Sequence, residues 1–199
     1  MGQTKAGYDW TYGGLWMLAN ILGWGASIWL SFFLTGLVGG RNGELWIVPC
    51  ALLIGLAQWL VLKRRFSLSG WLIPAYGLGW YVGLWLGIDL GFLTPEPFSM
   101  GAAGGALVGF LQWLSLRRRL RRSLIWIPTI IGGSLLGCWL GVLAGVSVTN
   151  SASVGVSAAY AIGGVVAGAV IGLFSGCVLV ILMGQDGRRR IGLTAGVST

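Results

Sequence analysis

The chain has 199 residues, which suits one domain or at most two. Hydrophobic residues make up 56% of it and charged residues 9%, and the mean hydropathy is +0.83. A soluble fold needs about a quarter of its residues charged, so this composition excludes a water-soluble globule and predicts an integral membrane protein. The net charge of +8 would suggest nucleic-acid binding in a soluble protein. Here the basic residues form short runs between apolar stretches, which is a topology signal, so we expect no nucleic-acid partner.

Six apolar stretches follow one another along the chain, and a bilayer crossing takes ~20 residues. Their limits are 15–38, 45–62, 71–91, 99–116, 124–147 and 158–183. The connecting segments alternate between neutral or weakly acidic and strongly basic, as in KRR at 63–65 and RRRLRR at 117–122. Only Arg41 falls on the side opposite the other basic residues. The positive-inside rule therefore orients the six predicted spans with both termini cytoplasmic.

An internal repeat organises these stretches. IGLAQWLVLKRR at 54–65 recurs as VGFLQWLSLRRR at 108–119, and Pro74 recurs as Pro128, both at an offset of 54. We expect three two-helix hairpins, 15–66, 71–122 and 124–183, between a polar N-terminal segment 1–14 and a basic tail 184–199. The third copy has diverged and carries Ser175 where Gln is expected. Hairpins with even numbers of spans all face the same way, so the predicted fold is an all-α bundle with pseudo-threefold symmetry along the membrane normal.

Glycine recurs at spacing four within several of these stretches. Such spacing keeps residues on one helical face, and small residues there let two backbones approach closely in lipid. We therefore predict glycine-zipper packing and no wide aqueous pore. The predicted packing positions are Gly79, Gly83, Gly87, Gly91, Gly101, Gly105, Gly109, Gly133, Gly137, Gly141, Gly145, Gly164, Gly168, Gly172 and Gly176.

Tryptophan is abundant, with 12 residues, and its positions predict two roles. Residues near the predicted span ends are expected to form interfacial belts. They are Trp16, Trp46, Trp71, Trp113 and Trp126. The deeper residues either fill grooves beside glycine or form an aromatic surface for a pigment, a quinone, a lipid tail or a partner helix. They are Trp24, Trp29, Trp80, Trp85 and Trp139.

Polar residues within the apolar stretches are the candidates for a binding site. Gln58 and Gln112 are repeat-equivalent and are followed by Trp59 and Trp113. They either hydrogen bond between helices or contact a cofactor, for which chlorophyll, carotenoid and bound lipid are the candidates. The arginine runs either only orient the chain or also contact anionic lipid or a partner. Their residues are Arg64, Arg65, Arg117, Arg118, Arg119, Arg121 and Arg122.

Chemistry-bearing residues are sparse. The chain has no histidine, and the spacing of Cys50, Cys138 and Cys177 does not suit a zinc site. We find no carboxylate pair at depth and no nucleophile beside a base, so we predict no catalytic residues, no metal and no enzymatic activity.

The GxxQWLxLRR segments, followed by WxIP and GW…WLG, resemble a loosely defined group of uncharacterised multi-spanning membrane proteins common in cyanobacteria and related phototrophs. The matching residues are Gly55, Gln58, Trp59, Leu60, Leu62, Arg64 and Arg65, and Gly109, Gln112, Trp113, Leu114, Leu116, Arg117 and Arg118. The resemblance implies a plasma or thylakoid membrane.

The lack of candidate catalytic residues and the apolar exterior together predict a non-enzymatic structural subunit or assembly factor of a larger membrane complex. A photosynthetic complex is one candidate. The protein would pack against other integral membrane proteins through its Trp- and Leu-rich flank. Two alternatives stay open: a small transporter or channel for a neutral solute, and a homo-oligomer that binds lipid or pigment.

Overall fold

A computed structural model describes residues 9–37, 47–66, 70–89, 96–120, 122–151 and 156–195. This part of the chain is helical and contains no strand. The α-helices are α1 (Trp10–Leu37), α2 (Ile47–Lys63), α3 (Leu72–Asp89), α4 (Glu96–Leu116), α5 (Trp126–Ser151) and α6 (Val156–Ala195), and the short 3-10 helix η2 (Ser123–Ile125) precedes α5. The prediction of an all-helical fold is confirmed.

Among the residues that the structure describes, four helical segments are long and apolar enough to cross a membrane: Trp10–Leu37, Phe98–Leu116, Ser123–Asn150 and Ser157–Gln185. The chain is thus a membrane protein by the length and composition of its helices. α2 and α3 have 17 and 18 residues and are the two shortest α-helices described. The structure therefore confirms several membrane-spanning helices, while the prediction of six spans stays a prediction.

Helix boundaries follow local chemistry. Asp9 caps α1, because its carboxylate accepts a hydrogen bond from the Tyr12 backbone N–H at 3.2 Å, so α1 begins at Trp10 and not at residue 15. Pro49, Pro74 and Pro128 fall in the first turns of α2, α3 and α5, where the missing N–H has no intrahelical partner to lose.

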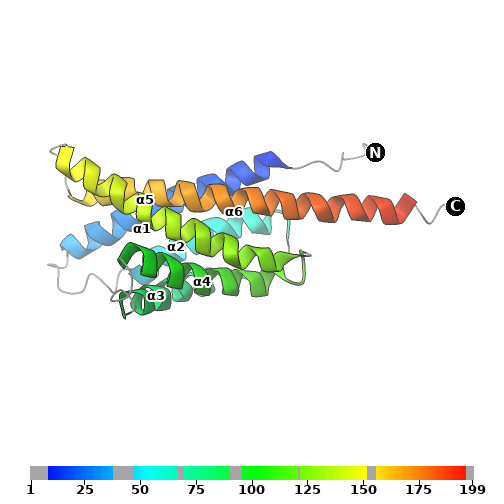
Figure 1. Ribbon diagram of the computed structural model, residues 1–199, viewed down its shortest axis with the longest axis horizontal. Helices are drawn as coiled ribbons and strands as arrows, with labels where there is room; N and C mark the ends of the chain where they lie inside the picture. Colours follow the sequence, from blue (N-terminus) through cyan, green and yellow to red (C-terminus); the bar gives the residue numbers. More distant parts are fainter. Residues whose placement is uncertain are drawn as a thin grey trace.

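The candidate span in α6, Ser157–Gln185, agrees with the predicted apolar stretch 158–183, but the helix itself continues to Ala195. Its 40 residues correspond to about 60 Å, roughly twice the hydrocarbon thickness of a bilayer. Figure 1 shows its C-terminal part extending beyond the other helices. The first part of the predicted tail 184–199 thus continues the last helix as far as Ala195. The helix passes through Gly184 and Gly187 without a break.

The helices form a closed ring in chain order. Each helix packs mainly against its neighbours in sequence, and α6 packs against α1. Figure 1 shows the helices running roughly along one long axis, with the starts of α1, α3 and α5 at the same end as the end of α6. Asp9 and Arg65 form an ion pair at that end, at 3.1 Å, which joins the start of α1 to the end of α2.

Glycines line the helix contacts all the way round this ring. A Cβ added to Gly55 of α2 would lie 2.9 Å from the Ile73 carbonyl oxygen of α3, and one on Gly168 of α6 would lie 2.5 Å from the Asn20 carbonyl oxygen of α1. The other predicted glycines also face the next helix, which a Cβ atom added to them would contact. Gly79, Gly83 and Gly87 of α3 face α4, and Gly101, Gly105 and Gly109 of α4 face α5. Gly133, Gly137, Gly141 and Gly145 of α5 face α6, and Gly164, Gly168, Gly172 and Gly176 of α6 face α1. Gly91 lies outside the described residues. Several glycines of α3, α4, α5 and α6 thus face the next helix in the ring, whereas α1 and α2 each contribute one, Gly23 and Gly55.

A matched pair of substitutions on α5 tests whether this contact supports the fold. A Cβ at Gly141 would lie 2.6 Å from the Gly163 carbonyl oxygen of α6, whereas one at Gly132 would meet nothing within 4 Å. We expect Gly141→Ala to lower the free energy of unfolding by about 1–3 kcal/mol, since backbone atoms must move apart. Gly132→Ala should change it by less than about 0.5 kcal/mol. Reversible unfolding by dodecyl sulfate in mixed micelles measures both, and equal effects of the two changes would contradict the prediction.

Candidate functional site

The centre of the ring is closed by a chain of buried hydrogen bonds. The Trp126 indole donates to Gln112 Oε1 at 2.8 Å, Gln112 Nε2 donates to Gln58 Oε1 at 2.7 Å, and Gln58 Nε2 donates to Asn20 Oδ1 at 2.8 Å. Asn20 Nδ2 then donates to the Trp16 backbone carbonyl at 2.9 Å. We call these residues, Trp16, Asn20, Gln58, Gln112 and Trp126, together with Ser175, the central network.

Ser175 joins the central network from α6. The Trp16 indole donates to Ser175 Oγ at 2.8 Å, and the Ser175 hydroxyl donates to the Ile171 carbonyl of its own helix. Ser175 stands at the position where the sequence repeat places glutamine, so all three repeat-equivalent positions take part in the same network. Serine is shorter than glutamine, but it still reaches a hydrogen-bond partner because the Trp16 indole extends from α1 toward Ser175.

The Trp126 indole fixes the orientation of the three amide side chains in the central network. An indole N–H can donate but cannot accept, so Gln112 must turn its oxygen toward Trp126 and its nitrogen toward Gln58. That choice in turn makes Gln58 accept with its oxygen and donate with its nitrogen to Asn20. The arrangement leaves no ambiguity about which amide atom faces which neighbour.

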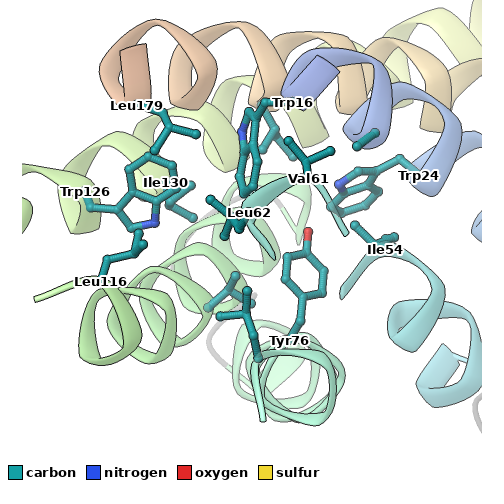
Figure 2. Close-up of a cluster of buried hydrophobic side chains, with 14 of the residues drawn as sticks. Trp16, Trp24, Ile54, Val61, Leu62, Tyr76, Leu116, Trp126, Ile130 and Leu179 are labelled. Atoms are coloured by element: carbon teal, nitrogen blue, oxygen red, sulfur yellow. The ribbon is translucent and has the colours of Figure 1, made fainter. Parts of the chain in front are cut away.

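Side chains of the central network are almost fully withdrawn from the surface. Trp16, Trp126 and Asn20 have an exposed fraction of 0%, Gln58 of 1% and Gln112 of 2%. The rings of Trp16 and Trp126 meet edge to face at 5.8 Å between centroids. Figure 2 shows Trp126, Trp16 and Trp24 projecting into the same core, around Leu62. The prediction that Trp16 and Trp126 form an interfacial belt is therefore wrong: both indoles are buried because their N–H groups find acceptors inside the bundle.

α3 adds an aromatic layer beside the network. Tyr76 is 2% exposed and projects into the same core as Trp24 (Figure 2). The Trp24 and Trp80 rings meet edge to face at 4.6 Å, which connects α1 to α3 across the ring. The indole N–H groups of Trp24 and Trp80, and the Ser134 hydroxyl, are buried without a hydrogen bond of good geometry. All six helices consequently contribute side chains to the centre.

Predicted cofactor residues do not gather in one place. Gln58 and Gln112 point into the core, and each amide already uses both its oxygen and a nitrogen in the central network. Trp59 and Trp113 are only partly buried and lie under cations, with Lys63 Nζ 4.4 Å and the Arg117 guanidinium 5.5 Å from the ring centroids. The first interpretation of the glutamines, interhelical hydrogen bonding, matches these contacts.

The basic residues lie at the end of the bundle where α1 begins. Arg64, Arg65, Arg117, Arg118, Arg119 and Arg122 are exposed, and Arg121 lies outside the described residues. Arg122 adopts the left-handed conformation, with φ 56°, at the turn into η2. These side chains form a positively charged surface.

Within the described residues, no cluster of three metal-ligating side chains occurs. Cys138 and Cys177 are free thiols, and the Cys50 side chain lies outside the described set. Comparisons of this chain with protein-family models, with curated proteins and with solved structures find no match.

Sequence reasoning missed three members of the central network: Asn20, Trp16 and Trp126. Asn20 is the one amide side chain in the first apolar stretch, and that isolation was a usable signal, since a buried amide needs partners. Trp16 and Trp126 gave no such signal, because the sequence does not show which face of a helix meets its neighbours.

Removing the middle of the network tests its contribution. Gln112→Leu leaves the Trp126 N–H and the Gln58 oxygen buried without their partner, so we expect the free energy of unfolding to fall by about 1–3 kcal/mol or more. Ser115→Ala on the same helix is the matched control, because Ser115 bonds only to the Leu111 carbonyl of its own helix, at 3.3 Å. Unfolding in mixed micelles measures both variants, and a Gln112→Leu protein as stable as Ser115→Ala would rule out a structural role for the network.

Proposed function

We propose that this protein is a non-enzymatic structural subunit or assembly factor of a larger membrane complex. The observation that carries the proposal is the filled centre of the helix ring. Side chains from all six helices meet there, with tryptophan, glutamine and asparagine hydrogen-bonded and buried. A solid core leaves the exterior as the surface through which the protein acts.

That exterior is apolar and rich in aromatic side chains. Trp29 and Phe33 of α1 stack at 5.2 Å, and Phe32 of α1 stacks on Tyr160 of α6 at 4.2 Å. All four are exposed by 38% to 50%. We name this group the α1–α6 aromatic patch. Its flat, preordered rings suit contact with a partner helix, with a pigment or lipid as a further occupant.

The finer architecture belongs to the same proposal. Three parallel-facing hairpins with glycine-zipper contacts would give a stiff bundle, since close backbone packing leaves little room for helices to slide. The resemblance to cyanobacterial multi-spanning proteins supports a plasma or thylakoid membrane and makes a photosynthetic complex one candidate assembly. The basic runs support an orientation with both termini cytoplasmic.

Topology is open to a direct test. We expect single cysteines at positions 64 and 118, in a background without the three native cysteines, to react with a membrane-impermeant maleimide only after the cytoplasmic side is opened. A cysteine at position 93, between α3 and α4, should react from the opposite side. Labelling of all three from one side would contradict the proposed orientation.

Association with partners tests the main proposal. In mild detergent the protein from its native membrane should migrate well above the mass of its own micelle, and the double variant Trp29→Ala, Phe33→Ala should shift it toward that mass. Leu22→Ala is the matched control, because Leu22 is 60% exposed on the same helix and belongs to no stacked pair. Migration of the wild-type protein alone would end the structural-subunit proposal.

A second candidate, passage of a small neutral solute, has one specific observation in its favour. The N–H groups of Trp24 and Trp80 and the Ser134 hydroxyl are buried polar groups without partners, and they occupy repeat-equivalent positions that follow Gly23, Gly79 and Gly133. Such groups could hydrogen bond to a solute if the core opened. Solute flux in proteoliposomes above that of empty vesicles, abolished by Trp80→Phe, would favour this candidate.

A further inference from the structure

Positive charge at the basic end of the bundle exceeds the negative charge that the structure places there. Lys63, Arg64 and Arg65 end or follow α2, and Arg117 and Arg118 follow α4, all exposed. Of the carboxylate side chains that the structure describes, Asp9 pairs with Arg65 at 3.1 Å and Asp89 lies at the end of α3, away from the basic end. The surface therefore suits a ligand that carries negative charge at the membrane boundary.

Two helix faces at this end carry the same arrangement of a tryptophan and a cation. Lys63 Nζ lies 4.4 Å from the centroid of the Trp59 ring on α2, and the Arg117 guanidinium lies 5.5 Å from that of Trp113 at the end of α4. In both, the cation follows the tryptophan by four residues, and the two pairs are offset by 54 residues. A cation resting on an indole face samples fewer conformations, so its donors are held in place for a ligand.

An exposed apolar side chain extends each pair away from the charged end. Leu56 is 38% exposed one turn before Trp59, and Phe110 is 45% exposed one turn before Trp113, with 5.8 Å between the Phe110 and Trp113 rings. Residues at i, i+3 and i+7 share one helical face and span about 10 Å along the axis. Each face thus passes from apolar side chain to indole to cation, in the order of acyl chain, interface and phosphate in a lipid leaflet.

We propose that these two faces, Leu56–Trp59–Lys63 and Phe110–Trp113–Arg117, are equivalent binding sites for an anionic phospholipid. The acyl chain lies along Leu56 or Phe110, the indole contacts the glycerol region, and the cation binds the phosphate. Arg64 and Arg118, next in sequence to each cation, add charge for an anionic headgroup. This role is separate from the proposed scaffold function and does not depend on it.

Native mass spectrometry of the full-length protein tests the proposal, with release from mixed micelles of phosphatidylglycerol and phosphatidylcholine. We expect the wild-type protein to retain two phosphatidylglycerol molecules in preference to phosphatidylcholine. Trp113→Leu leaves the net charge unchanged, and it should weaken one site by roughly tenfold because the cation loses its aromatic support. Arg117→Gln should weaken the same site, and Arg117→Lys should restore it.

Control variants distinguish a specific lipid-binding site from non-specific electrostatic attraction of anionic lipid. Trp85→Leu, at a 39% exposed tryptophan near the opposite end of α3, should retain both lipids. Equal retention by Trp113→Leu and wild type would show that charge alone attracts the lipid and would overturn the proposal. Equal retention of phosphatidylcholine, or displacement of the lipid by millimolar inorganic phosphate, would overturn it as well. If Trp113→Leu fails to fold, Trp59→Leu applies the same test to the first site.

Discussion

Close backbone approach at the glycine faces is the constraint on which the rest of this structure depends. In a bilayer no hydrophobic force drives helices together, so contact must come from packing and hydrogen bonds. Because Gly168 brings the α6 backbone against the Asn20 carbonyl and Gly55 brings α2 against Ile73, short side chains can meet in the centre. Glutamine and asparagine would not span a ring held apart by larger residues at these contacts.

The central network then gives the ring a single arrangement. Apolar packing alone tolerates small rotations of a helix, whereas the amides of Gln58 and Gln112 must face each other in one register. The donor-only indole of Trp126 orients the whole chain of bonds, and Trp16 carries it to α6 through Ser175. Buried polar groups thus act here as specificity devices, since an unpaired amide in this core costs more than a paired one contributes.

A filled centre and a patterned exterior divide the protein's functions between inside and outside. The inside holds the fold together, while the outside carries exposed aromatic stacks at one end and tryptophan–cation pairs at the other. Both surface features sit on helices that the core fixes in place. This division underlies the proposal that the protein acts by positioning partner helices and lipids.

The sequence by itself determined the helical class and the membrane environment, because composition and hydrophobic periodicity report on the solvent, and it singled out Gln58 and Gln112 as repeat-equivalent without deciding between a hydrogen bond and a cofactor contact. The prediction of an interfacial belt was wrong for Trp16 and Trp126, since a position near the end of an apolar stretch does not reveal whether the side chain faces lipid or the neighbouring helices. Only the tertiary structure decided that α6 closes the ring on α1, that Asn20 and Ser175 complete the network, and that Trp59 and Trp113 stay outside. These outcomes depend on which faces meet across the ring, and contacts between helices far apart in the chain leave no local pattern from which to read them.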